Sequence, residues 1–213
     1  MAAEAERTAE PSAYPCAPTR RRGETLEHAI FDAVLEQLRT VGYAGLTMEG
    51  VAACAHTGKA ALYRRWAGKD DLVVDALNHV LPSPCDLPDH GDVRDDLLDL
   101  LRRMTEFLNS PAGCALENVI ADIEPDGRFA QLLHERIKKP RKQMFLSLLR
   151  RAAERGQIRP EAITQLVADV GPALVMQRFS ADGPPVPDAY VVSVVDDVVM
   201  PLLRAPVNAR QAG

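Results

Sequence analysis

The chain has 213 residues, of which 46% are hydrophobic and only 5% aromatic, and its formal net charge is −5. This length suits one or two compact units, and a core built mainly from leucine, alanine and valine favours helices. No apolar run approaches the ~18 residues of a membrane span, and the first 20 residues contain no apolar segment typical of a secretion signal. Four cysteines without CxxC spacing indicate free thiols in a reducing compartment. We therefore expect a cytoplasmic protein without a membrane partner.

The acidic net charge hides a more basic N-terminal region. Residues 20–70 carry eight Lys or Arg against six Asp or Glu, whereas the remainder of the chain is acidic. Because contacts to phosphate depend on local charge, this region is a candidate for binding nucleic acid. We interpret residues 1–22 as a flexible arm that ends in Arg20, Arg21 and Arg22, and these arginines can reach into a minor groove. A solvated basic tail is the alternative.

Apolar residues at helical spacing predict four helices in the first 82 residues. Gly42 is suited to end the first of them, since glycine tolerates the left-handed conformation that closes a helix. Thr47 is a suitable N-cap for the second, and the turn His56-Thr57-Gly58 separates the second from the third. The predicted helices cover residues 24–41, 48–55, 59–66 and 70–80.

A connector rich in proline and aspartate spans residues 81–91, and we place a domain boundary near residue 82. The helical pattern that follows contains Pro140, which either separates two helices or kinks a single one. The valines of the last segment would also suit a strand, but an isolated strand has no sheet to join. The predicted helices here cover residues 93–108, 112–123, 126–139, 141–155, 161–179 and 188–203. The sequence thus predicts an all-α fold of about nine helices, with domains at 23–82 and 83–206 and a disordered tail at 207–213.

The two short helices around residues 56–58 have the arrangement of a helix-turn-helix, in which the second helix enters the major groove of DNA. Lys59 stands at the start of this second helix, and the small side chains after it allow a close approach to the groove. Tyr63 and Arg64 offer a hydroxyl and a cation to phosphates, while Trp66 is expected to anchor the helix in the core. The basic residues of the region therefore gather around one short helix.

The stretch GYAGLTMEGVAACAHTGKAALYRRWAGKDDLVVDAL resembles the N-terminal DNA-binding domain of the TetR family of bacterial regulators. The matching features are Tyr43, Thr47, Val51-Ala52, Leu62-Tyr63-Arg64, Trp66 and Lys69-Asp70-Asp71-Leu72. The turn departs from the family's usual Gly-Val-Ser, so His56 would have to adopt the left-handed conformation. The resemblance implies a DNA-binding regulator, a repressor released from its operator by a small, mostly apolar effector. The DNA-binding residues we expect are Arg21, Arg22, Thr47, Thr57, Gly58, Lys59, Ala60, Ala61, Tyr63, Arg64 and Lys69.

The C-terminal part contains a set of Met and Phe side chains that adapt to irregular apolar shapes. In the TetR family this domain holds an effector pocket, and the resemblance implies one here. Ordinary core packing is the alternative for each residue taken singly. The ligand-binding residues we expect are Met104, Phe107, Leu108, Ile120, Phe129, Met144, Leu148 and Met176.

The predicted helices 161–179 and 188–203 are apolar beyond what a single buried face requires. A four-helix contact with the same two helices of a second copy would bury the excess. Such a homodimer would present two heads to the halves of a near-palindromic double-stranded operator. The interface residues we expect are Leu166, Val170, Leu174, Val195, Val199 and Leu203.

The sequence offers little evidence for an enzyme. The adjacent pairs Asp95-Asp96 and Asp196-Asp197 point in different directions on a helix and do not form an acid–base pair. His79, Cys85 and His90 fit no standard zinc spacing. We therefore predict no catalytic residues, no metal and no cofactor. The alternative is a helical ligand-binding protein or enzyme in which the helix-turn-helix is only scaffold.

Overall fold

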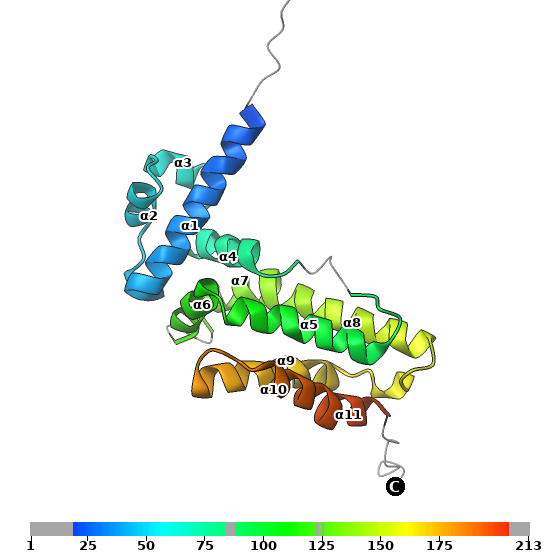
Figure 1. Ribbon diagram of the computed structural model, residues 1–213. Helices are drawn as coiled ribbons and strands as arrows, with labels where there is room; N and C mark the ends of the chain where they lie inside the picture. The colour runs from blue at the N-terminus through cyan, green and yellow to red at the C-terminus, as the bar shows by residue number, and fades with distance from the viewer. Residues whose placement is uncertain (1–18, 84–87, 122–123, 125, 205–213) are drawn as a thin grey trace, which may run out of the picture.

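The computed structural model describes residues 19–83, 88–121, 124 and 126–204, and the regular secondary structure in these ranges is entirely helical (Figure 1). The prediction of an all-α fold of about nine helices is confirmed, counting contiguous helical stretches as one helix each and leaving aside a short 3-10 turn at Pro160–Ala162. Within these ranges, no helix is long and apolar enough to cross a membrane. The helices are α1 (Thr19–Gly45), α2 (Met48–Cys54), α3 (Lys59–Tyr63), α4 (Lys69–Val80), α5 (Val93–Leu108), α6 (Pro111–Ala121), α7 (Arg128–Leu133) with α8 (Lys139–Glu154), α9 (Gln165–Asp182), and α10 (Asp188–Ser193) with α11 (Met200–Arg204).

Helices α1 to α4 form the head of the molecule. The face of α1 that carries Ile30, Val34 and Leu38 is fully buried, and α1 packs against α2 and α4 of the head and against α6 of the body. The hydroxyl of Thr47 accepts a hydrogen bond of 3.1 Å from the amide of Gly50, which confirms the predicted N-cap of α2. Helix α1 begins at Thr19, earlier than predicted, and its regular geometry is interrupted at Gly42, whose φ is +70°. Residues 1–18 of the predicted arm and the predicted tail at 207–213 lie outside the described residues.

The remaining helices form the body. In Figure 1, α5 and α8 lie side by side, and α9 packs beside the final run of α10 and α11. The predicted start of α5 is confirmed, because the carboxylate of Asp92 accepts hydrogen bonds from the amides of Arg94 and Asp95. Helix α9 begins at Gln165, after the 3-10 turn, and extends to Asp182. The valine-rich segment 188–204 is helical throughout, so the strand alternative is wrong.

Two π-helical segments interrupt the body helices, and each lies just before a proline. The segment His134–Lys138 joins α7 to α8 ahead of Pro140, and Val194–Val199 joins α10 to α11 ahead of Pro201. Proline lacks an amide hydrogen and its ring crowds the carbonyl four residues earlier. A local π-helical widening accommodates both effects without ending the helix. Pro140 therefore lies within one continuous helical run.

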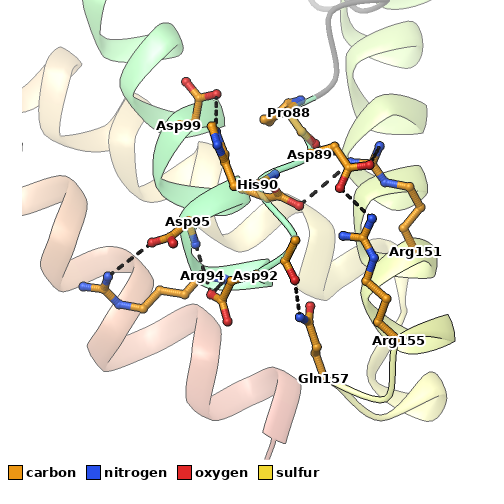
Figure 2. A network of polar contacts seen from close by, with 12 residues as sticks. Pro88, Asp89, His90, Asp92, Arg94, Asp95, Asp99, Arg151, Arg155 and Gln157 are labelled. Atoms are coloured by element: carbon orange, nitrogen blue, oxygen red, sulfur yellow. Dashed lines mark hydrogen bonds and ion pairs between the residues drawn. The ribbon is translucent and has the colours of Figure 1, made fainter.

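A polar network fixes the start of α5 to the end of α8 (Figure 2). Arg155 donates to Asp89 at 2.5 Å, and Gln157 donates to the carbonyl of Gly91 at 2.6 Å. The backbone amide of His90 donates to the buried carboxylate of Asp96 at 2.6 Å. These contacts hold the segment before α5 against the body.

Hydrophobic packing crosses the boundary predicted near residue 82. The head core extends past α4 into α6, α7 and the first π-helical segment, as Figure 1 shows for α6 near α1 and α7 beside α4. Head and body are therefore joined by a shared core as well as by the connector. The body residues in this head core are Ala115, Val119, Phe129, Leu133 and Ile137.

Candidate nucleic-acid interface

Helix α3 is oriented by two side chains that face the head core. Leu62 is fully buried and Trp66 is 5% exposed, which confirms Trp66 as a core residue. The indole Nε1 of Trp66 donates to Asp75 of α4 at 3.0 Å. The helix ends at Tyr63 rather than at residue 66, since the amides of Arg65 and Trp66 both bond to the carbonyl of Leu62 in a tight turn. The buried pair therefore fixes which face of α3 points outward.

The turn before α3 adopts the conformation that the sequence required. His56 has a φ of +51°, so the prediction of a left-handed histidine at this position is confirmed. Gly58 caps α3 without a side-chain bond, and a Cβ added there would meet no atom within 4 Å. The space directly beside Gly58 is thus open.

The outward face of α3 carries the polar residues that were predicted to contact DNA. Lys59 and Arg64 are exposed, and Tyr63 is 51% exposed. Lys59 forms an ion pair with the exposed Glu49 of α2, and this hydrogen bond raises the pKa of Lys59 and lowers that of Glu49. An exposed ion pair contributes little stability, so Lys59 can exchange Glu49 for a phosphate at low cost.

Lys69 is positioned differently from the α3 residues. Its Nζ donates to the carbonyl of Tyr43 at 3.0 Å and lies 4.3 Å from the centre of the Tyr43 ring. The hydroxyl of Tyr43 donates to Asp70 at 2.6 Å, and burial together with this bond raises the pKa of Tyr43. Lys69 therefore closes the end of α1 onto α4, and a contact with phosphate would have to use its remaining donors.

The other predicted DNA-binding residues lie around α2 and α3. Thr47 and Ala60 are exposed, and Thr57 and Ala61 are half-buried. Arg21 and Arg22 belong to the first turn of α1, but their side chains lie outside the described residues. Arg65, which the sequence places beside Arg64, is instead paired with Glu27 of α1 at 3.2 Å.

The ionic contact between head and body was not predicted from the sequence. Asp71 of α4 is 8% exposed and accepts from Arg128 at 2.9 Å and from Arg136 at 2.8 Å. Arg136 also reaches Asp75 at 3.2 Å. Asp75 in turn holds the indole of Trp66. Arg136 of the body is thus two contacts away from the end of α3.

The predicted ligand-binding residues separate into two groups. Phe129 belongs to the head core and stacks on Tyr43, so it does not join the others. The side chain of Ile120 lies outside the described residues. The others gather in or against the body core, where Met104, Met144 and Met176 are half-buried and Phe107, Leu108 and Leu148 are buried.

The residues predicted for the dimer contact lie in two different environments. Val195, Val199 and Leu203 are 0% exposed because they pack into the core of their own chain, so their side chains have no surface left for a partner. Leu166 of α9 is 76% exposed, and Val170 and Leu174 on the same helix are half-buried. Leu202 of α11 is 41% exposed. The apolar surface that is accessible therefore lies mainly on α9.

A helix-turn-helix head on a helical body defines a DNA-binding regulator. The family model described as "Bacterial regulatory proteins, tetR family" matches residues 30–76, and that described as "Tetracyclin repressor-like, C-terminal domain" matches residues 87–198. The chain belongs to the TetR family. Members of this family are transcriptional regulators that bind DNA operators and ligands and are not enzymes, and dimerisation is typical of them. The alternative of a helical enzyme is therefore set aside.

Individual relatives agree with this assignment. The chain is 30% identical over 184 residues to the DNA-binding transcriptional repressor TetR of Mycobacteroides abscessus, covering 86% of this chain and 96% of the relative. The crystal structure of the TetR family transcription regulator SCO0332 has a TM-score of 0.66 at 33% identity, covering 82% and 96% of the two chains. A third structure, FadR of Bacillus subtilis in complex with stearoyl-CoA, is 16% identical with a TM-score of 0.58, covers 83% and 97%, and shares the fold.

Proposed function

We propose that two copies of this chain bind a near-palindromic DNA operator in the cytoplasm, each inserting α3 into the major groove. The observation that carries this proposal is the two-sided character of α3. Leu62 and Trp66 hold the helix in the core while Lys59, Tyr63 and Arg64 face outward. Two heads about 34–36 Å apart would engage successive major grooves.

Selection of bound sequences from a random duplex library tests this proposal. We expect a consensus with two related half-sites, and an affinity that falls steeply with salt because phosphate contacts release counterions. Arg64→Ala should weaken binding about tenfold or more and reduce the salt slope by about 1. Arg150→Ala, an exposed arginine on α8, is the matched control and should leave binding unchanged. A consensus with one half-site, or binding independent of salt, would contradict the proposal.

The name of a relative and the composition of the body core support a proposal for the direction of regulation and for the response to an effector. The M. abscessus relative is named a repressor, and we infer that this chain also represses transcription and is released by a small, mostly apolar effector. The half-buried methionines 104, 144 and 176 around the body core support an adaptable apolar site there. An effector can release DNA only if it prefers the arrangement that does not bind DNA. Operator DNA must then weaken effector binding by the same factor, which calorimetry with and without operator can measure.

For the dimer we infer a contact centred on α9 rather than on the buried side of the last helix. Leu166 supplies exposed apolar surface, and the neighbouring Val170 and Leu174 are incompletely covered. A two-fold contact would bring the same patch of both copies together. Sedimentation of the full chain at micromolar concentration tests the stoichiometry, and a monomer that binds both half-sites independently would contradict it.

A further inference from the structure

The structure contains a cleft between head and body that the proposed effector site does not use. It has a volume of about 630 Å³, within the roughly 300–1,000 Å³ of small-molecule sites. Helix α1, the end of α4, α5 and the start of α6 meet there (Figure 1). Of the residues predicted to bind ligand, Phe107 alone lines it. We call it the junction cleft, and its apolar lining includes Leu35, Val80, Leu81, Phe107, Pro111 and Ala112.

Five charged side chains line the junction cleft: Asp32, Glu36 and Arg39 from α1, and Arg103 and Glu106 from α5. Both sets follow helical spacing, so each helix presents one charged face to the cleft. The two arginines are already neutralised by acids on their own helices. Arg39 binds Glu36 through two bonds of 3.0 and 2.7 Å, and Arg103 binds Asp99 through two bonds of 2.9 Å.

Asp32 and Glu106 are the other two acidic residues that line the junction cleft. Both are exposed, and neither makes a hydrogen bond or ion pair with any residue that the structure describes. Asp32 stands on the head and Glu106 on the body, and both line the junction cleft. A molecule that has apolar groups and a positive charge would match both the apolar lining and the two carboxylates of the junction cleft.

We propose that the junction cleft binds an amphipathic organic cation, whose apolar part fills the lining and whose charge is held between Asp32 and Glu106. The occupant would contact head and body at the same time, so its binding would depend on the angle between them. A ligand that favours one angle must shift DNA affinity, because binding and conformation are linked. This regulatory step rests on the proposed function, whereas the binding site itself does not.

Two probes of the same shape and opposite charge test the site: tetraphenylphosphonium and tetraphenylborate. Calorimetry on the full chain should show one saturable tetraphenylphosphonium site per chain and at least about tenfold weaker binding of tetraphenylborate. The isosteric double variant Asp32→Asn with Glu106→Gln should lose about tenfold in affinity for the cation. Glu161→Gln removes an exposed carboxylate from the distant 3-10 turn and should change nothing.

Three results would overturn the site: no saturable binding of the cation, equal binding of both probes, or an unchanged affinity in the double variant. Ala112→Phe, which fills the lining, should abolish binding while circular dichroism shows the same helical content. Coupling is read separately by repeating the titration with saturating operator DNA. An unchanged cation affinity would overturn the coupling. A chain that binds the cation but no DNA would contradict the proposed function and leave the site intact.

Discussion

The ring of Tyr43 at the end of α1 stacks on the ring of Phe129 in α7, with centroids 4.2 Å apart and planes inclined by 17°. Tyr43 also bonds to Asp70 and supports Lys69, both at the start of α4. Phe129 lies in the body, close in sequence to Arg136, which binds Asp71 and Asp75 of the same helix α4. The stack therefore attaches the segment 128–138 to the end of α1, and the ion pairs attach it to α4.

Stacking between Tyr43 and Phe129 should be measurable as a coupling energy. A double-mutant cycle with Tyr43→Leu and Phe129→Leu isolates the ring–ring interaction from the other contacts of each residue. We expect a coupling of about 1 kcal/mol in the free energy of unfolding, measured with urea. Phe145→Leu, a buried phenylalanine of the body core, is the control and should show no coupling with Tyr43.

Asp71→Asn should destabilise the protein by about 1–2 kcal/mol. The substitution keeps the shape of the side chain but removes the charge that accepts from Arg128 and Arg136. Both arginines are more than one-third exposed, so solvent screening keeps the loss well below that of a fully buried pair. Asp32→Asn, at an exposed carboxylate without such partners, should stay within about 0.5 kcal/mol. Equal effects of the two substitutions on urea unfolding would remove the argument for an ionic attachment.

Tyr63→Phe should weaken DNA binding without changing the stability of the protein. Tyr63 is half exposed, so loss of its hydroxyl should leave the free energy of unfolding unchanged. If the hydroxyl donates to a phosphate, its removal costs about 1 kcal/mol, or about fivefold in affinity. Tyr190→Phe is the matched control, because its hydroxyl donates to the carbonyl of Leu174 at 3.2 Å within the body. That variant should lose stability and retain DNA affinity in a gel-shift titration.

The contact between His90 and Asp99 predicts a dependence of stability on pH. The hydrogen bond of 3.0 Å to Asp99 raises the pKa of His90, so the folded state favours the imidazolium. Its contribution is complete below the ordinary pKa of histidine, about 6.5, and is lost as the pH rises through the raised value. The stability difference between the wild type and His90→Gln should therefore be larger at pH 5.5 than at pH 8.5. In an Asp99→Asn background this trend should shrink, and a trend of opposite sign would show that the pair is not formed.

Local signals made most of the head predictable from sequence. Thr47 has the hydroxyl of an N-cap, Gly42 tolerates the conformation at the end of a helix, and the apolar spacing of α1 marks its buried face. Trp66 was placed in the core correctly, because a short helix needs a large apolar side chain to anchor it there. Each of these inferences depends on residues within a few positions of one another.

Contacts between distant segments were not predictable in the same way. Apolar spacing shows that Val195, Val199 and Leu203 need burial, but it cannot distinguish the core of the same chain from the surface of a partner. Phe129 was grouped with the residues of the effector pocket for the same reason, although it packs on Tyr43 in the head core. Arg136 carries no local signal that it would reach α4, since the meeting of the two helices depends on the tertiary fold. The junction cleft is likewise formed by segments that are far apart in the chain.

The exposed apolar surface of α9 leads to a prediction about assembly. Leu166→Glu places a charge at a position that is 76% exposed in the single chain, so the fold of each copy should survive. If Leu166 lies in the dimer contact, burial of that charge without a partner is costly, and sedimentation should show a monomer of normal helical content.

Val199→Ala should affect stability rather than assembly, because Val199 is fully buried. It should lower the free energy of unfolding by about 1–3 kcal/mol through a cavity and leave the dimer intact where the chain is folded. Gln143→Glu adds the same charge to the exposed face of α8 and should change neither property. A Leu166→Glu protein that remains dimeric at micromolar concentration would place the contact on another surface.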